Sequence, residues 1–159
     1  MARTTVTKAD AELADTALLA SRALVGVIAR SVTPALERVS LPQLRVLVLL
    51  GSMGTTRSGA IAELVGVHPS TFSRTTDRLV QGGWVRRVAN PSSRRETLVE
   101  LTDAGRRLVA QVMQRRRSEL ARILVRIPPD RREALLDAFE EFSLAAGETS
   151  LSELATLGV

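Results

Sequence analysis

The chain has 159 residues, of which 45% are hydrophobic and 25% charged, with a formal net charge of +5. This composition allows one compact domain, or two lobes that share helices, with a substantial core. The sequence contains no cysteine, which excludes disulfides, thiolate metal sites and cysteine redox switches. Because a zinc site around the single histidine, His68, would have to use carboxylates alone, we expect neither a metal nor a cofactor.

The apolar runs are all shorter than the roughly 18–20 residues that span a bilayer. The N-terminal segment 1–15 also lacks the apolar stretch of a signal peptide. We therefore expect a soluble, cytoplasmic protein without a membrane partner.

The first part of the chain predicts one long helix over residues 9–32. Its apolar residues recur at steps of three and four, which is the period of an α-helix. Pro34 should end or kink this helix because proline lacks the N–H that an internal helix position requires, and Thr33 is the expected cap of a further turn. The apolar positions are Leu13, Ala17, Ala20, Leu24, Ile28 and Val32.

A second helix is expected directly after Ser40. Ser40 and Gln43 have the spacing of a capping box, in which each side chain bonds to the backbone of the other residue. The following segment is apolar on nearly all sides, which is typical of a helix at the centre of a fold. Gly51 and Gly54 mark its end.

The next segment predicts two short helices joined by a tight turn. Residues 58–65 form the first helix, which Gly66 ends. Pro69 suits the first position of the second helix, because the N–H at that position has no partner within a helix. This second helix should run to about Gln81, before Gly82-Gly83. A short helix, a glycine-containing turn and a second helix together form the helix-turn-helix pattern.

A β-hairpin is expected next. Residues 84–89 and 96–102 are two short β-prone runs, and Asn90-Pro91 between them is a turn signal. The arginines near the turn give the hairpin a basic tip.

The C-terminal part predicts two helices. Thr102 should cap a long helix over about 103–126, and the segment Ile127-Pro128-Pro129-Asp130 breaks it. A last helix over about 130–146 carries an apolar face, and residues 148–159 form a small tail with a loose helical turn or more. The apolar face consists of Leu135, Leu136, Phe139 and Phe142.

The positive charge is concentrated between His68 and Arg95. This segment holds six arginines and one acid, a net +5, while the remaining residues balance at 16 basic against 16 acidic. It covers a helix, a turn and a hairpin, a shape that fits the grooves of duplex DNA. Few aromatic residues are available to stack unpaired bases, which favours duplex DNA over RNA or single strands. The charged residues are Arg74, Arg78, Arg86, Arg87, Arg94 and Arg95, with Asp77.

The second helix of the pair presents hydroxyls and arginines within one broad sector. Hydroxyls at the helix start can reach phosphates or base edges, and the helix N-terminus itself favours phosphate. Arg74 can take guanine O6 and N7 with two donors. A solvated helix face is the alternative, and the basic hairpin that follows argues against it. The predicted DNA-binding residues on this helix are Ser70, Thr71, Ser73, Arg74 and Arg78.

The hairpin tip supplies the other predicted DNA-binding residues, Arg94 and Arg95. A narrow basic hairpin can enter a minor groove, where negative potential is concentrated. The alternative is a charged turn that keeps the protein soluble, but the tip lies directly beyond the helix offered to the major groove. On the strand before the tip, alternation allows only one of Arg86 and Arg87 to face the DNA.

These motifs, in this order and spacing, resemble the MarR family of winged-helix transcriptional regulators. The resemblance covers about residues 10–146, and the segment 41–50 is similar to the family's second helix. The matching residues are Ser70, Ser73-Arg74, Asp77-Arg78-Leu79, Gly83-Trp84-Val85, Arg95, Leu101-Thr102 and Gly105.

The resemblance implies a mainly α fold with a small β-hairpin in a single chain, 1–159. It implies a winged helix-turn-helix DNA-binding region at 41–102 and a helical dimerisation region at 8–38 and 103–147. The chain would act as a homodimer on a pseudo-palindromic operator in double-stranded DNA, as a repressor located at the nucleoid. Many family members are released from DNA by a small aromatic or anionic ligand. The alternative to the dimer is a monomer whose terminal helices pack on each other.

The sequence departs from the family pattern at two places. The wing aspartate falls on Ser93, so the ion pair that would brace Arg95 is weakened or replaced. Thr75 and Thr76 occupy positions that are usually apolar, and they either face DNA or form hydrogen bonds within the helix.

Arginines on the helices that would line a family ligand pocket are expected to be surface or interhelical charges. These are Arg22, Arg30 and Arg45. His68 is expected to be a helix-start residue rather than a sensor. A second hypothesis for the chain is a winged-helix protein-interaction module without DNA binding. An enzyme finds no support, because the sequence shows no nucleophile–base pair, no glycine-rich phosphate loop after a strand and no metal cluster.

Overall fold

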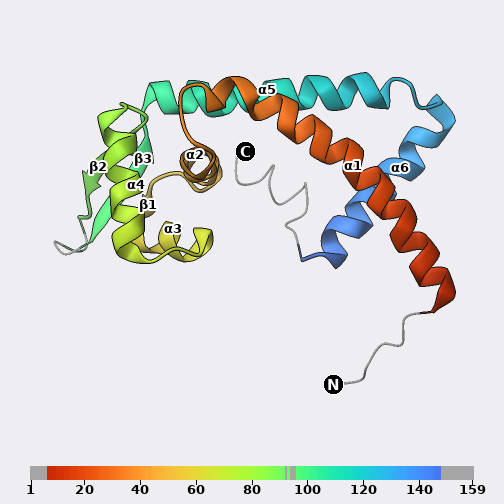
Figure 1. Cartoon of the computed structure of the whole chain (residues 1–159), viewed down its shortest axis with the longest axis horizontal. Coiled ribbons are helices and arrows are strands. Elements are labelled where there is room, and N and C mark those ends of the chain that lie inside the picture. Colours follow the sequence, from red (N-terminus) through yellow and green to blue (C-terminus); the bar gives the residue numbers. More distant parts are fainter. Residues whose placement is uncertain (1–6, 92, 94–95, 148–159) are drawn as a thin grey trace.

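The computed structural model describes residues 7–91, 93 and 96–147, and it has a compact lobe at one end and long helices that extend from it (Figure 1). The predicted DNA-binding residues Arg94 and Arg95 and the tail 148–159 lie outside the described residues. In chain order the elements are α1 (Lys8–Leu36), α2 (Leu41–Met53), β1 (Thr56–Arg57), α3 (Ser58–Val65), α4 (Pro69–Gln81), β2 (Val85–Ala89), β3 (Thr97–Leu101), α5 (Asp103–Leu124) and α6 (Pro129–Ala145).

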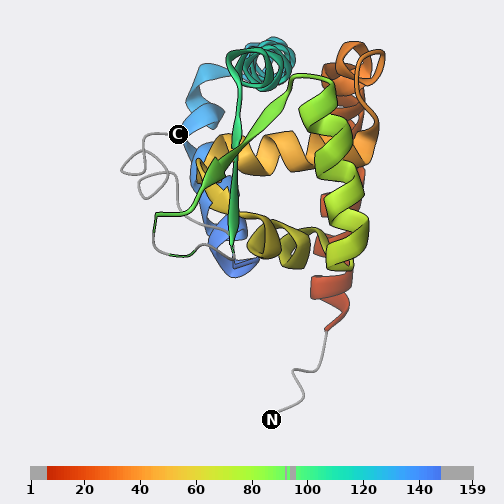
Figure 2. The same ribbon diagram turned by 90° about the vertical axis from the view of Figure 1, so that its left-hand side faces the viewer.

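The compact lobe is a winged helix-turn-helix, as the sequence predicts. Figure 2 looks onto this lobe and shows α4 and the strands flanking α2, with α3 at one end and α5 at the other. The predicted hairpin of β2 and β3 is confirmed, with Val85 opposite Leu101. A third strand, β1, pairs with β3 through Thr56 and Val99 and was not predicted. Two residues are too few to show the alternation by which a strand is recognised.

The ends of the helices are set by the expected capping residues. Ser40 and Gln43 form the predicted capping box, in which Gln43 Oε1 accepts from the Ser40 N–H at 2.7 Å. Thr102 caps α5 by accepting from the Gly105 N–H at 3.2 Å. Each cap satisfies a backbone N–H that the first turn of a helix leaves without a partner.

Of the two effects predicted for Pro34, an end or a kink of the first helix, the end is wrong. α1 continues through Pro34 to Leu36, and the Thr33 hydroxyl donates to the Ala29 carbonyl at 2.9 Å instead of capping a new turn. Proline removes one backbone hydrogen bond near the C-terminal end of a long helix. The following residue, Ala35, is 2% exposed and belongs to the core, so we infer that tertiary packing carries the helix past the proline.

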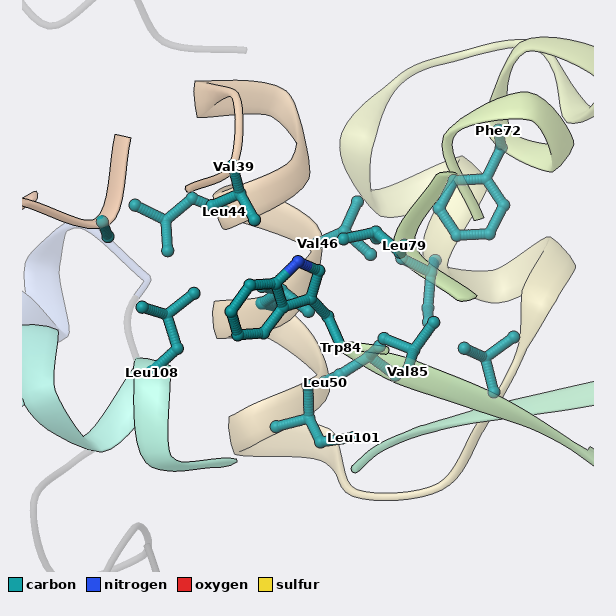
Figure 3. Packing of buried hydrophobic residues seen from close by; sticks show 14 of the residues in the cluster. Val39, Leu44, Val46, Leu50, Phe72, Leu79, Trp84, Val85, Leu101 and Leu108 are labelled. Carbon is teal, nitrogen blue, oxygen red and sulfur yellow. The ribbon is translucent and has the colours of Figure 1, made fainter. Parts of the chain in front are cut away.

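The core lies in the compact lobe and centres on α2. Leu44, Val46, Leu47 and Leu50 are all buried, which confirms the prediction of a central helix. Trp84 belongs to the same cluster, and Figure 3 shows its ring near the middle of the packed side chains. Within the described residues, no helix is long and apolar enough to cross a bilayer.

A joint built around Trp84 connects the compact lobe to α5. The carbonyl of Trp84 accepts from the Thr102 N–H at 3.0 Å, and the Thr102 hydroxyl lies 2.6 Å from the carbonyl oxygen of Gly83. Gly105 packs so closely that a Cβ on it would lie 2.2 Å from the Trp84 oxygen. Only glycine therefore allows the first turn of α5 to approach the start of β2.

We predict that Gly105→Ala lowers the free energy of unfolding by about 1–3 kcal/mol, because the added methyl must push α5 away from the Trp84 carbonyl. Urea denaturation followed by circular dichroism measures the change. Gly59→Ala is the matched control, since nothing lies within 4 Å of a Cβ there. It should leave stability unchanged or raise it by up to about 1 kcal/mol. Equal effects of the two substitutions would contradict the steric explanation.

Candidate nucleic-acid interface

Helix α4 has one buried face and one exposed face. Phe72, Thr76 and Leu79 recur at helical steps and are buried in the core. The predicted DNA-binding residues of α4 all lie on the exposed part of the helix: Ser70, Thr71, Ser73, Arg74 and Arg78. The core face thus fixes the helix on the lobe and leaves the hydroxyls and arginines open to a partner.

The start of α4 is capped by the single histidine. Gly66 ends α3 in the left-handed region at φ 70°, and the chain then enters α4 at Pro69. The Nδ1 atom of His68 accepts from the Ser70 backbone N–H at 3.3 Å and lies 2.9 Å from the Ser70 hydroxyl oxygen. This geometry confirms that His68 is a helix-start residue.

The two threonines that depart from the family pattern form hydrogen bonds within the helix. Thr76 is buried, and its hydroxyl donates to the Phe72 carbonyl at 3.1 Å. Thr75 is half-buried, and its hydroxyl donates to the Thr71 carbonyl at 3.2 Å. The structure thereby decides between the two alternatives in favour of bonding within α4.

The arginines of β2 point to opposite sides of the sheet, as strand alternation predicts. Arg87 donates to Asp77 Oδ1 of α4 at 2.6 Å and therefore lies on the side of the sheet that faces α4. Arg86 pairs with Glu100 on the other face. A hydrogen bond from Thr55, and then the one from Arg86, lower the pKa of Glu100.

These ion pairs divide the basic segment into two groups. Arg86 and Arg87 are held by carboxylates of the same chain. Arg74 and Arg78 are exposed, and within the described residues neither has an ion-pair partner. Among the described residues of the basic segment, the arginines without an ion-pair partner are therefore those of α4.

The carboxylate of Glu96 connects the turn end of the hairpin to β1, and this connection was not predicted from the sequence. Glu96 Oε1 accepts from Arg57 of β1 at 3.3 Å, and Glu96 Oε2 accepts from Asn90 at 3.0 Å. Glu96 thus connects β1 to both arms of the hairpin. The Ser93 N–H donates to the Asn90 carbonyl at 3.2 Å within the turn. No local signal points to the Arg57–Glu96 pair, because its members are 39 residues apart.

A polar hollow of about 460 Å³ lies between α3, α4 and the strands. Its walls carry two arginines and two glutamates, so their charges balance. Among the described residues, no group of three His, Asp or Glu side chains could hold a metal ion. The lining residues are Arg57, Ser58, Gly59, Ala60, Glu63, Ser73, Arg87, Glu96 and Thr97.

Comparison with known proteins places the chain in a family. The sequence profile of the MarR family matches residues 39–97. A relative from Bacillus subtilis, the uncharacterized HTH-type transcriptional regulator YfiV, is 30% identical over 107 residues, which are 67% of each chain. The chain belongs to the MarR family. It is a transcriptional regulator with a winged helix-turn-helix, as the resemblance in its sequence indicates.

Solved structures of MarR-like proteins share this fold. The crystal structure of RV1404 from Mycobacterium tuberculosis has a TM-score of 0.81 and 39% identity, and the match covers 91% of this chain and 99% of that one. The structure of a mutant MarR from Escherichia coli complexed with operator DNA has a TM-score of 0.56 at 20% identity, over 82% of this chain and 93% of that one. At that identity the second likeness supports the fold alone.

Proposed function

We propose that this MarR-family chain binds duplex DNA sequence-specifically and regulates transcription as a homodimeric repressor. The observation that carries the proposal is the exposed face of α4, where Arg74 and Arg78 stand without an ion-pair partner among the described residues. Repression would follow where the bound dimer occupies a promoter and excludes RNA polymerase. A regulator of this kind acts at the chromosome, so we place it in the cytoplasm, at the nucleoid when it is bound to DNA.

In the proposed complex, α4 enters the major groove. N-terminal residues of a recognition helix contact base edges first, so Ser70 and Thr71 come next to bases or phosphates. Arg74 follows one turn later, where its guanidinium can take guanine O6 and N7. Arg94 and Arg95 of the wing are proposed to reach the adjacent minor groove.

The terminal helices support the proposed dimer because many of their apolar residues are exposed in the single chain. Leu13 of α1 is 70% exposed and Phe142 of α6 is 66% exposed, and α6 has no buried residue. Exposed apolar surfaces of this size are typical of sites at which another protein chain binds. We therefore propose 8–38 and 103–147 as the dimerisation region and 41–102 as the DNA-binding region. Two-fold symmetry would then place the recognition helices about one DNA turn apart, roughly 34–36 Å.

The proposed ligand is a small aromatic anion. A hollow of about 300 Å³ lies where α2, α3 and α4 meet, and its walls are apolar except for Arg45 and Thr75. Apolar walls with one guanidinium complement an aromatic ring that carries a carboxylate. Arg30 pairs instead with Glu119 of α5 at 3.1 Å, which confirms it as an interhelical charge. The lining residues are Leu41, Pro42, Arg45, Val46, Val65, Val67, Phe72 and Thr75.

The first test of this function is DNA binding by arginine variants. We expect Arg74→Ala and Arg78→Ala to weaken binding about tenfold or more to a duplex selected by the parent from a random library. Arg74→Ala should also change the preferred sequence, whereas Arg95→Ala should weaken binding to all sequences. Fluorescence anisotropy over a salt series gives both the affinities and the phosphate contribution.

Arg86→Ala is the matched control, because Arg86 pairs with Glu100 on the other face of the sheet from Arg87. It should bind DNA nearly as tightly as the parent. If Arg74→Ala and Arg95→Ala both bound like the parent, the assignment of the interface would be wrong. If the parent bound no duplex at moderate salt, the protein-interaction module would be favoured.

The dimer is tested by placing a charge on the uncovered face of α6. Phe142→Arg should convert the dimer to a monomer at micromolar concentration, because a buried unpaired charge opposes association. Sedimentation velocity measures the change. Leu64→Arg is the control, since Leu64 is also exposed, at 52%, but lies on α3 in the other lobe. A monomeric parent, or a dimeric Phe142→Arg variant, would contradict this interface.

The ligand is tested with benzoate as the probe. Benzoate at millimolar concentration should raise the melting temperature of the parent, because a ligand that binds only the native state stabilises it. Benzyl alcohol, which lacks the charge, should have a smaller effect. Arg45→Ala should abolish the difference between the two compounds. An equal response of parent and variant would exclude the hollow beside Arg45 as the site.

A further inference from the structure

We propose that His68 fixes the hydrogen-bonding direction of Ser70, so that this pair determines specificity at the tip of the recognition helix. In this arrangement Ser70 offers DNA an acceptor, and His68 offers it a donor. The proposal rests on the DNA-binding function proposed above and adds the chemical class of base group that the helix tip selects.

The hydrogen bond to the Ser70 backbone fixes the tautomer of His68. A backbone N–H can only donate, so the Nδ1 atom that it reaches at 3.3 Å must carry a lone pair. The proton of the neutral ring is therefore on Nε2. Because the two ring nitrogens point in diverging directions, Nε2–H points away from the helix start that Nδ1 caps. His68 is exposed, so this donor is open to a partner.

The same lone pair fixes the hydroxyl of Ser70. The hydroxyl oxygen lies 2.9 Å from Nδ1, and since Nδ1 is an acceptor, the hydroxyl must donate to it. The Ser70 oxygen then has only lone pairs to offer to DNA. A serine without this neighbour could rotate its hydroxyl and either donate or accept, and it would discriminate little between bases.

An acceptor at this position distinguishes bases in the major groove. The exocyclic amino groups of adenine and cytosine are donors there, whereas guanine O6 and thymine O4 are acceptors. Ser70 should therefore favour adenine or cytosine at the base that it contacts. The Nε2–H of His68 should meet a nearby acceptor of the DNA, either a phosphate oxygen or a purine N7.

Histidine is an uncommon choice for this cap, and the choice supports the proposal. Serine, threonine, aspartate and asparagine are the preferred capping residues, and their short side chains use the capping oxygen alone. His68 caps the helix with one nitrogen and retains a second polar atom at its exposed edge. The stability of the helix start and its hydrogen bonding to DNA are thus set by one ring.

The test is a selection from a library of random duplexes, read by sequencing, with the parent, Ser70→Ala and His68→Gly. Glycine is tolerated at the N-cap, so His68→Gly should fold with a melting temperature close to that of the parent. Ser70→Ala should remove the preference for adenine or cytosine at one base pair and weaken binding on the order of tenfold. His68→Gly should broaden the preference at that same base pair, because it removes the acceptor that holds the hydroxyl of an intact Ser70.

The double variant should broaden the preference no further than Ser70→Ala, because both changes act on one hydroxyl. If His68→Gly loses a preference at a second position, the partner of Nε2–H is a purine N7. If it loses affinity equally for all sequences, the partner is a phosphate. Gln81→Ala, at the other end of α4, is the control and should leave every preference unchanged.

The proposal is overturned if the parent selects guanine or thymine at the position that Ser70 contacts, or if His68→Gly leaves the preference there unchanged. It is also overturned if Ser70→Ala alters no preference. A parent that enriches no duplex would instead refute the proposed function itself, which separates that failure from the failure of the helix-tip proposal.

Discussion

The contact between the Trp84 carbonyl and the first turn of α5 is the constraint on which the arrangement of this protein depends. Thr102 and Gly105 meet that carbonyl from one side, and the turn that ends α4 precedes it on the other. The recognition helix is therefore positioned relative to α5 through a few hydrogen bonds and one glycine. Because α5 belongs to the proposed dimerisation region, the distance between two recognition helices depends on this joint.

The arginines of the basic segment differ in whether they are paired with a carboxylate of the same chain. A count along the sequence treats the six arginines as equivalent, but two of them are held by Asp77 and Glu100. These two position the strand against α4 and β3, and they offer little charge to a partner. Counterion release depends on phosphates that are neutralised, so the salt dependence of binding should reflect fewer contacts than the arginine count suggests.

Much of the fold could be predicted because its signals are local. Helical periodicity located the helices, and the Ser40–Gln43 spacing located the start of α2. The prediction of which residues of α4 are exposed was also correct. The errors concern interactions between distant segments. The two residues of β1 form a strand because they pair with β3. Helix α1 continues past Pro34, and the next residue, Ala35, is buried in the core. The Arg57–Glu96 and Arg86–Glu100 ion pairs also join residues that are far apart in the chain. Local sequence patterns could therefore not show which arginines are paired.

The two lobes differ in how they are stabilised, and this difference bears on regulation. The core of the winged-helix lobe also takes in Ala35 of α1 and Leu108 and Val112 of α5, whereas α6 contributes no buried residue and many apolar residues of α1 are exposed. In the proposed dimer the terminal helices gain their cover from the partner, so their stability rises with the concentration of the chain. The Trp84 joint connects α4 to α5. When the dimerisation region becomes ordered, the distance between the two recognition helices is therefore fixed as well. Association and affinity for a two-site operator are then coupled through the same contact.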